Sequence, residues 1–400
     1  MELSERTRSI SASLTLAITA KAKAMKKKGE SVLNLGAGEP DFDTPYFIKE
    51  ATKQALNNGF TKYTPSSGIK ELKEAISKKY EEEYNLKYSP EEIIVSCGAK
   101  HALFNAMMAL INKGDEVIIP SPYWVSYPEM VKFTEGKPVI VKTEEKNDFK
   151  LTPSQLEKAI TKKTKILIVN TPSNPCGSVY KKEELKSIAR ILIKHKIFCL
   201  FDEIYEKIIY KTSHINIATL SKKMKELSIV INGVSKTFSM TGFRIGWALA
   251  RKELVQAMTS IQSHSTSNPT SFSQKGALFA LKSKKSKKIV EKMVKEFKKR
   301  RDYVVEAINS IKGLSCLRPE GAFYVFVNIS SLLNKPYKGN LLKTSLEFAK
   351  ILLEEKKLAV IPGIAFGNDN YIRISYAASI KDLKNGIQRL QEFVNEIKKD

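Results

Sequence analysis

The sequence predicts an α/β protein with a mainly parallel, seven-stranded sheet that carries helices on both faces, followed by a smaller α+β unit. Seven short apolar runs are separated by helical stretches, and strands that alternate with helices form parallel sheets covered on both sides. Of the 400 residues, 42% are hydrophobic, which is enough to bury a large core. After the seventh run the alternation changes, so a second unit is expected.

The first expected element is an amphipathic helix over 11–28, with Ser11 or Ser13 as its N-cap and Gly29 at its end. Apolar spacing then predicts two helices between strands, over 100–112 and 182–194. Seven apolar runs are expected to form the strands, over 92–97, 116–120, 139–143, 165–170, 197–202, 228–234 and 245–250.

The smaller unit is expected to follow a long basic helix. Its predicted elements are a strand over 322–328, a helix over 341–355, short strands over 358–361 and 371–375, and a closing helix from Ile380. An isolated amphipathic helix needs a partner surface, so the N-terminal helix is expected to join this unit. We therefore expect a large domain over 46–280 and a small domain that combines 1–45 with 281–400.

The net charge of +25 raises the possibility of nucleic-acid binding. The densest basic stretch, 281–301, holds eleven Lys and Arg but only two Glu. Within it Val290, Met293 and Phe297 recur at helical spacing, which predicts a helix with its lysines on the solvent face. Aromatic residues that could stack on bases are not interleaved with the charges. We expect no nucleic-acid partner.

Other features bear on location and metal binding. The four cysteines lack Cys-x-x-Cys spacing, and the four histidines lack the spacing of a metal site. The charged N-terminus does not resemble a secretion signal, and no segment reaches the roughly 18 apolar residues of a membrane span. We expect a cytoplasmic protein with no membrane partner and no metal.

Polar residues follow three consecutive strands of the expected sheet. Asn174 lies in a turn after the fourth strand, Asp202 and Tyr205 end the fifth, and Ser235 and Lys236 follow the sixth. Because the carboxyl ends of parallel strands meet at one edge of a sheet, these side chains should converge in one crevice. A lysine there can react with an aldehyde, and the aldehyde cofactor of amine chemistry is pyridoxal 5'-phosphate.

This cofactor needs an amine, an acid for its ring nitrogen, donors for its ring oxygen and a phosphate cradle. Lys236 can supply the amine and Asp202 the acid, while Asn174 and Tyr205 can bond the ring oxygen. A helix N-terminus with a nearby cation suits the phosphate. The residues expected there are Gly98, Ala99, Lys100, Ser235 and Arg244.

Three motifs resemble those of the class I aminotransferases of pyridoxal-phosphate fold type I: Asn174-Pro-x-Gly177, Asp202-x-x-Tyr205 and Ser235-Lys236-x-Phe-x-Met-x-Gly-x-Arg244. The resemblance extends from the Gly-Ala-Gly-Glu-Pro-Asp-Phe segment at 36–42 to 371–375. It implies that the large domain holds the cofactor, that Lys236 binds it covalently and then moves the substrate proton, and that Arg373 clamps the substrate α-carboxylate. Cys176 stands where the family usually has threonine.

The same resemblance implies further site residues. Trp124 would stack on the cofactor ring, and Tyr63 would reach the phosphate in a neighbouring subunit, which implies a homodimer with shared sites. Core packing is the alternative for both aromatic side chains. Gly38 would let the substrate carboxylate approach the backbone, and Trp124 and Asn174 would also contact substrate.

Lys100 bears on the choice of substrate. In the bacterial aspartate aminotransferase subgroup, which this sequence resembles, a lysine here binds the distal carboxylate. The alternative is a solvent-facing lysine at a helix start. The resemblance implies that L-aspartate and 2-oxoglutarate give oxaloacetate and L-glutamate in a ping-pong reaction through pyridoxamine phosphate.

Other functions remain open on this fold. Some members of the subgroup also accept prephenate with the help of a lysine near the first helix, where this chain has Ser11. An aminotransferase for alanine or aromatic substrates, a pyridoxal-phosphate lyase and a nucleic-acid-binding regulator are the remaining alternatives.

Overall fold

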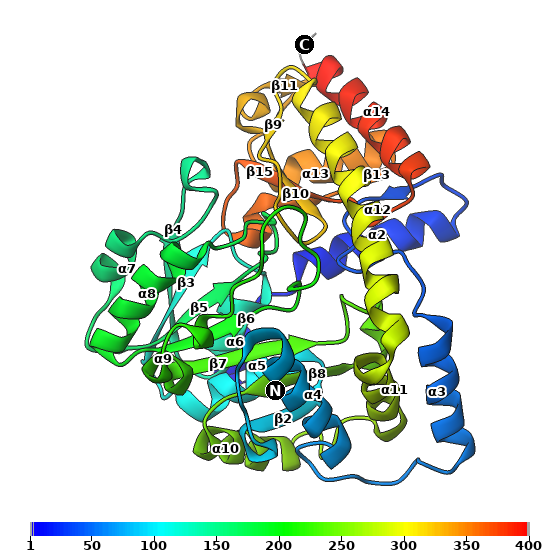
Figure 1. Cartoon of the computed structure of the whole chain (residues 1–400). Helices are drawn as coiled ribbons and strands as arrows, with labels where there is room; N and C mark the ends of the chain where they lie inside the picture. The colour runs from blue at the N-terminus through cyan, green and yellow to red at the C-terminus, as the bar shows by residue number, and fades with distance from the viewer. Residues whose placement is uncertain (1, 3, 398–400) are drawn as a thin grey trace.

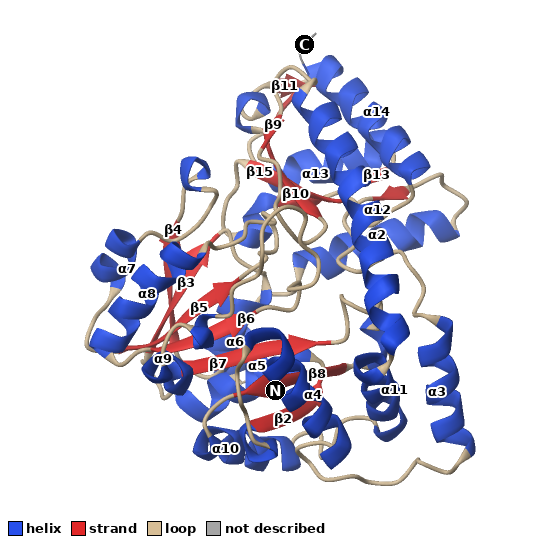
Figure 2. Ribbon diagram, viewed as in Figure 1, coloured by secondary structure: helices blue, strands red, loops and turns tan. Residues whose placement is uncertain are grey.

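The structure is a computed structural model, and it describes residues 2 and 4–397. Its main sheet has seven strands in the order β2-β8-β7-β6-β5-β3-β4 (Figures 1 and 2). Only β8 runs antiparallel to its neighbours, so the predicted mainly parallel sheet is confirmed. The strands are β2 (Ile93–Cys97), β3 (Glu116–Ser121), β4 (Lys137–Lys142), β5 (Thr164–Asn170), β6 (Phe198–Asp202), β7 (Ser228–Gly233) and β8 (Ile245–Leu249).

Alternating side chains of each strand pack on opposite faces of this sheet. In β2, Ile94 contacts the core beneath α5, whereas Ile93 and Val95 contact the core beneath α4. Both faces are therefore buried, which explains the continuous apolar runs in the sequence. One face carries α5 (Ala99–Leu110), α6 (Ser126–Phe133) and α10 (Lys252–Ser263). The other carries α4 (Lys70–Tyr84), α8 (Lys182–His195), α9 (Lys222–Leu227) and α11 (Ser271–Lys282).

A second sheet, in the order β14-β15-β10-β9, lies beyond the main sheet (Figure 1). Its long, central pair is antiparallel, with Phe326 opposite Arg373. The strands are β9 (Ser315–Cys316), β10 (Tyr324–Asn328), β14 (Ile361–Pro362) and β15 (Tyr371–Ser375). The helices packed with it are α12 (Lys284–Asn309), α13 (Ser345–Lys356) and α14 (Ile380–Ile397).

The N-terminal segment packs against this second unit. Helix α2 (Leu14–Lys27) leads to β1 (Leu33–Asn34), which pairs in parallel with β13 (Leu358–Ala359). Ala22 of α2 is buried in the same cluster as Leu353 and Ala359. Segments from the C-terminal part of the chain therefore pack against α2, whereas α3 (Tyr46–Asn57) packs on α11.

Several predicted boundaries are wrong for local reasons. The helix predicted over 11–28 is α2 and begins at Leu14, because Ser13, one of the two predicted N-caps, caps it. A short helix, α1 (Glu5–Ser9), precedes it. Helix α13 begins at Ser345 because Thr344 and Glu347 form a capping box, so 341–344 is not helical. The run 358–361 is split between β13 and β14, which belong to different sheets.

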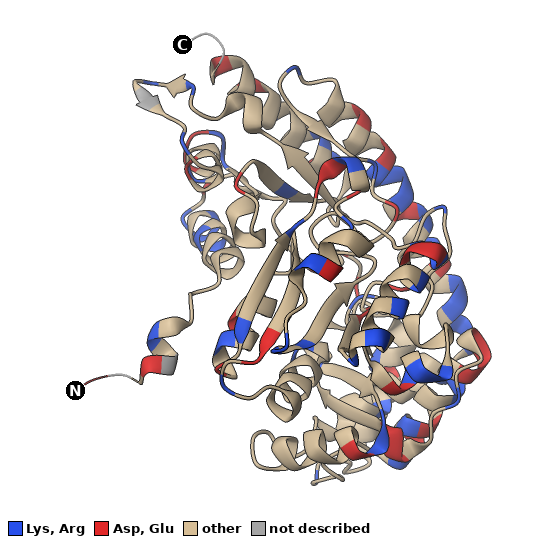
Figure 3. Ribbon diagram, turned by 90° about the vertical axis from the view of Figure 1, so that its left-hand side faces the viewer, with Lys and Arg blue, Asp and Glu red and all other residues tan. Residues whose placement is uncertain are grey.

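The basic segment 281–301 spans the junction of two helices, which its composition does not indicate. Helix α11 ends at Lys282, and Ser283 accepts a hydrogen bond from the backbone of Lys285 as the N-cap of α12. Val290, Met293 and Phe297 are buried as predicted, and the lysines between them are exposed. Lys and Arg are also spread over many other helices and loops (Figure 3). No helix in the described residues has the length and apolar character of a membrane span.

Candidate active site

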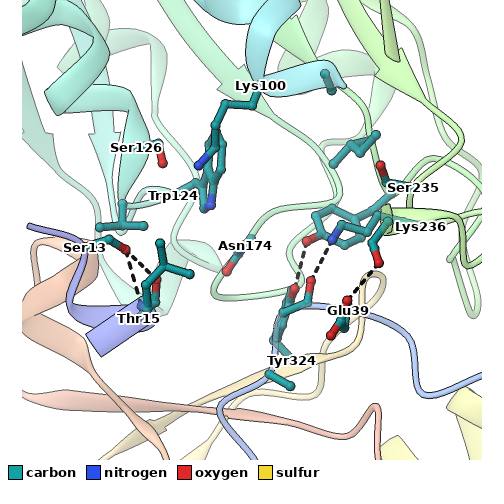
Figure 4. Close-up of a pocket in the computed structure, with 18 of the residues that line it drawn as sticks. Ser13, Thr15, Glu39, Lys100, Trp124, Ser126, Asn174, Ser235, Lys236 and Tyr324 are labelled. Carbon is teal, nitrogen blue, oxygen red and sulfur yellow. Dashed lines mark hydrogen bonds between the residues drawn. The ribbon is translucent and has the colours of Figure 1, made fainter. Parts of the chain in front are cut away.

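A cavity of about 460 Å³ lies at the carboxyl ends of β5, β6 and β7. The three strands are adjacent in the sheet, so the polar residues that follow them meet there. Figure 4 shows side chains that enter this cavity from opposite walls, with Lys236 and Ser235 on one side and Trp124 and Lys100 on the other. The sequence-predicted residues that line the cavity are Gly38, Ala99, Lys100, Trp124, Asn174, Asp202, Tyr205, Ser235, Lys236, Arg244 and Arg373.

Two predicted site residues do not line this cavity. Gly98 is the N-cap of α5 and directly precedes Ala99, which lines the cavity. It lies within contact distance of Arg244. Tyr63 is 89% exposed and lies outside the cavity of its own chain. A role for Tyr63 therefore depends on a second copy of the chain.

Lys236 follows β7 and points at the loop that precedes α3. Its Nζ donates a hydrogen bond of 2.6 Å to the carbonyl oxygen of Gly38. Burial lowers the pKa of Lys236 to about 8, and Arg373 and Arg244 act in the same direction, while Glu39 and Asp202 oppose them. At pH 7 about a tenth of this amine is therefore neutral, far more than for an ordinary lysine, and the neutral amine is the form that attacks a carbonyl or accepts a proton.

Asp202 ends β6 with its carboxylate inside the protein. It accepts hydrogen bonds from the Tyr127 hydroxyl at 2.7 Å and from the Ile204 backbone N–H at 3.1 Å. Burial raises the pKa of Asp202 to about 6, although both hydrogen bonds favour the ionised form. A buried carboxylate in this position suits a cationic N–H group, such as a protonated ring nitrogen.

Gly98 and Arg244 form an anion cradle at the start of α5. Gly98 has φ +86°, and a Cβ added to it would lie 2.4 Å from Nη2 of Arg244. A Cβ on Gly246 would lie 2.1 Å from the backbone nitrogen of Ala99. The two glycines thus let Arg244 and β8 approach the helix N-terminus, where Ser235 also faces the cavity. The backbone N–H groups of a helix start, a guanidinium and a hydroxyl together fit a phosphate group.

Arg373 provides a buried cation in the cavity lining. Its side chain lies on β15, is 3% exposed, and rests 4.4 Å from the ring centre of Tyr324. Nη1 donates to Oδ1 of Asn174 at 2.9 Å, and Nη2 donates to the carbonyl oxygen of Gly36 at 2.7 Å. Its Nε has no partner among the described residues. Because a guanidinium has five N–H donors, this one keeps donors for a carboxylate.

Two hydroxyl groups at the site were missed from the sequence. Tyr324 shares a hydrogen bond of 2.8 Å with Tyr205 and comes from β10, where nothing in the sequence distinguishes it from other strand residues. Tyr127, which bonds Asp202, follows Trp124 by three residues in the same segment, and this spacing on a helix start could have indicated it. Burial raises the pKa of both Tyr205 and Tyr127.

Lys100 and α2 form the outer wall of the cavity. Lys100 Nζ lies 4.9 Å from the ring centre of Trp124, and burial and Arg244 lower the pKa of Lys100. Trp124 itself meets Tyr127 edge to face at 5.3 Å between ring centres. Leu16, Thr19 and Lys23 of α2 also line the cavity, although the sequence showed only an amphipathic helix there.

Comparisons with known proteins agree with this geometry. The family model for aminotransferase class I and II matches residues 30–390. An aspartate aminotransferase of Bacillus subtilis is 46% identical, over 99% of this chain and 100% of its own. An aspartate/prephenate aminotransferase of Nitrosomonas europaea is 44% identical, over 99% of this chain and 100% of its own.

Solved structures give the same result. A crystal structure of the aspartate aminotransferase from Rhizobium meliloti has a TM-score of 0.95 and 42% identity, over 99% of each chain. The aspartate aminotransferase of Thermus thermophilus with maleate has a TM-score of 0.93 and 40% identity, over 98% of this chain and 99% of its own. The similarity therefore covers both sheets and the cavity between them.

Proposed function

Because the chain belongs to the class I and II aminotransferase family, we propose that it transfers the amino group of L-aspartate to 2-oxoglutarate and forms oxaloacetate and L-glutamate. The observation that carries the proposal is the arrangement of three cationic side chains, Lys236, Arg373 and Lys100, around one cavity. A dicarboxylic amino acid offers two anions and one amine. Arg373 and Lys100 can each pair with one carboxylate, and the aldehyde of the bound cofactor would take up the amine beside Lys236.

The residues around the cavity fit pyridoxal 5'-phosphate, the cofactor of this family. When bound, it supplies an aldehyde that takes up the amino group and a protonated ring that withdraws electrons from the substrate carbon. Asp202 would hold the ring nitrogen and keep it protonated. Trp124 would cover the ring, and Asn174 and Tyr205 would bond its oxygen. The phosphate would be held by Gly98, Ala99, Lys100, Ser235 and Arg244.

Arg373 would bind the α-carboxylate of the substrate. The unpartnered Nε and the remaining N–H groups of Nη1 and Nη2 can donate in parallel to two carboxylate oxygens. Asn174 and the Gly36 carbonyl fix the plane of the guanidinium before substrate arrives, which reduces the entropy lost on binding. Gly38 leaves room beside Nη2 of Arg373, because even an added Cβ would lie 4.0 Å away.

Lys236 would move the proton of the substrate carbon. Its pKa of about 8 is close to neutral pH, so the amine can both accept and return a proton without a large energetic penalty. Lys100 would meet the distal carboxylate from the start of α5, and its flexible stem would reach carboxylates that differ by one methylene.

We also propose a homodimer in the cytoplasm, with a cofactor-holding large domain over 46–280 and a small domain that combines 1–45 with 281–400. The exposed ring of Tyr63 supports a dimer in which each chain completes the other's site. All four cysteines are free thiols, as expected in a reducing compartment. Analytical ultracentrifugation of the purified protein tests the dimer, which a monomeric mass at micromolar concentration would exclude.

Prephenate is the second candidate substrate, since curated relatives carry aspartate/prephenate names. Ser11 does not line the cavity, and its backbone N–H is bonded to Glu129 at 2.8 Å. We therefore rank prephenate below 2-oxoglutarate as the amino acceptor.

Steady-state assays compare these substrates directly. Aspartate, alanine, phenylalanine and cystathionine are offered as amino donors, with 2-oxoglutarate or prephenate as acceptors. The proposal expects the highest kcat/KM for aspartate with 2-oxoglutarate. A higher kcat/KM for any other donor and acceptor pair would contradict the proposed substrates.

A further inference from the structure

The segment 36–45, called the strap below, lies against Lys236 and is fixed at several points. Thr44 Oγ1 donates to the carbonyl oxygen of Ser239 at 2.6 Å. Asp41 accepts hydrogen bonds from Nη1 of Arg300 at 2.7 and 2.9 Å, and Phe42 packs on the ring of Phe297. The strap is thus held both by the loop after Lys236 and by α12, so its backbone has a defined position at the cavity.

Glu39 on the strap is tied to the loop that carries Lys236. Its Oε2 accepts a hydrogen bond of 2.8 Å from Thr241 Oγ1, and the preceding residue, Gly38, accepts the hydrogen bond from Lys236 Nζ. Figure 4 shows Glu39 on the same side of the cavity as Lys236. The two hydrogen bonds therefore join the strap to the loop of Lys236, although the two segments are almost 200 residues apart in the chain.

Other charged and titratable groups face Lys236 from each packed element. Asp202 lies at the end of β6, Arg373 on β15 and Arg244 in the loop between β7 and β8. The ring centre of Tyr205 lies 6.0 Å from Nζ of Lys236. Burial and both arginines disfavour the ammonium form. Of the two carboxylates that favour it, Glu39 has a larger effect than Asp202.

We propose that Glu39 is a positioning residue that acts through Lys236: the hydrogen bond from Thr241 to Glu39 ties the strap to the loop of Lys236 and keeps the Gly38 carbonyl oxygen in place to accept from Nζ, and the negative charge of Glu39 attracts the ammonium group. The inference rests on the proposed function, in which Lys236 carries the substrate proton. Glu39 is exposed to solvent, so water weakens its effect. We therefore expect the protonation equilibrium of Lys236 to change about threefold, which is half a pKa unit, when the charge is removed.

Competitive labelling of Lys236 tests this inference in the full chain freed of cofactor. Trace acetic anhydride reacts with neutral amines only, and mass spectrometry follows the acetylation of Lys236 across the pH range from about 6 to 10. The Glu39→Gln variant keeps the size of the side chain and an oxygen that can accept from Thr241. In this variant the midpoint of the pH dependence of Lys236 acetylation should move to lower pH. Lys236 should then be labelled about threefold faster at pH 7 than in the wild type.

Three further variants separate charge from structure. Glu39→Asp restores the charge and should return the midpoint most of the way to the wild-type value. Thr241→Val keeps the charge but removes the tether, so its midpoint should lie between those of the wild type and Glu39→Gln. Glu183→Gln, an exposed carboxylate that pairs with Lys186 on α8 and lies outside the cavity, should leave the midpoint unchanged.

The inference is overturned if Glu39→Gln labels at the wild-type rate, or if Glu183→Gln shifts the midpoint equally. Because labelling uses neither substrate nor cofactor, its outcome is independent of whether aspartate is the substrate.

Discussion

Gly98 and Arg244 are so close that a Cβ on the glycine would lie 2.4 Å from Nη2 of the arginine. The contact joins the start of α5 to the loop before β8 and creates the anion cradle. Gly98 also has φ +86°, a conformation that residues with a side chain rarely adopt. Both facts make the cradle sensitive to the smallest possible addition at this position.

Gly98→Ala should therefore weaken cofactor binding while the protein stays folded. The added methyl group must displace the Arg244 guanidinium, and we expect the Kd for pyridoxal 5'-phosphate to rise about 10- to 100-fold, equivalent to about 1.4 to 2.8 kcal/mol. Gly242→Ala is the matched control, because a Cβ there meets nothing within 4 Å. Fluorescence titration of the cofactor-free proteins measures both values. If the Gly98 and Gly242 variants bind pyridoxal 5'-phosphate with equal affinity, the proposed role of the anion cradle in binding the cofactor phosphate is wrong.

The buried amine of Lys236 should make stability depend on pH. Its pKa is about 8 in the folded protein and 10.5 in the unfolded chain, so the unfolded state binds more protons between these values. Stability is reduced below pH 8 and is regained as the pH rises toward 10.5. The full difference corresponds to about 3 kcal/mol.

Lys236→Met removes this titration. The free energy of unfolding of the cofactor-free wild type, minus that of the variant, should increase by about 2 to 3 kcal/mol between pH 8 and 10.5. Urea denaturation at several pH values measures the difference. A difference that stays constant with pH would mean that the Lys236 amine titrates normally.

Replacing Arg373 with lysine should affect substrate more than cofactor. A lysine cannot donate in parallel to both carboxylate oxygens or satisfy Asn174 and Gly36 together. The loss of charge-assisted hydrogen bonds is expected to lower kcat/KM for aspartate about 100-fold or more. Arg251→Lys, which removes a guanidinium stacked on Phe198 away from the cavity, should be close to wild type. An unchanged kcat/KM for aspartate in Arg373→Lys would exclude the proposed binding of the α-carboxylate by Arg373.

Lys100→Gln should reduce the preference for dicarboxylic substrates. The change removes the cation proposed for the distal carboxylate, so kcat/KM for aspartate should fall about 10- to 100-fold while that for alanine stays within about twofold. Lys70→Gln is the control, since Lys70 also begins a helix but lies outside the cavity. If the values for aspartate and alanine fall together, Lys100 serves the cofactor and not the distal carboxylate.

The sequence predicted the main sheet and the three strand ends that form the cavity floor because these depend on local patterns. Asp202 ends one apolar run, Asn174 and Lys236 follow two others within four residues, and parallel strands bring such positions to one edge. Strand boundaries were therefore close to those observed. Helix starts were less accurate, since Thr344 and Ser13 act as caps only when the neighbouring backbone takes the capping geometry.

Residues from distant segments could not be placed in this way. Tyr324 reaches Tyr205 only because β10 packs across the cavity, and Glu39 reaches Thr241 only because the strap returns to the main sheet. These contacts depend on how two sheets pack, and no periodicity in the sequence encodes that packing. The resemblance to aminotransferases indicated Arg373, but the hydrogen bonds that fix its plane required the structure.

The central claim is that the protein transfers an amino group between dicarboxylic acids and that Lys236 moves the substrate proton. Two half-reactions followed by absorbance test this claim most directly. The purified protein with pyridoxal 5'-phosphate receives L-aspartate alone, and 2-oxoglutarate is added afterwards. We predict that aspartate shifts the visible band of the cofactor to the near ultraviolet within one turnover and that 2-oxoglutarate restores it. In Lys236→Ala both changes should slow by several orders of magnitude. A spectrum that does not respond to aspartate, or a Lys236→Ala variant that responds at the wild-type rate, would contradict the claim.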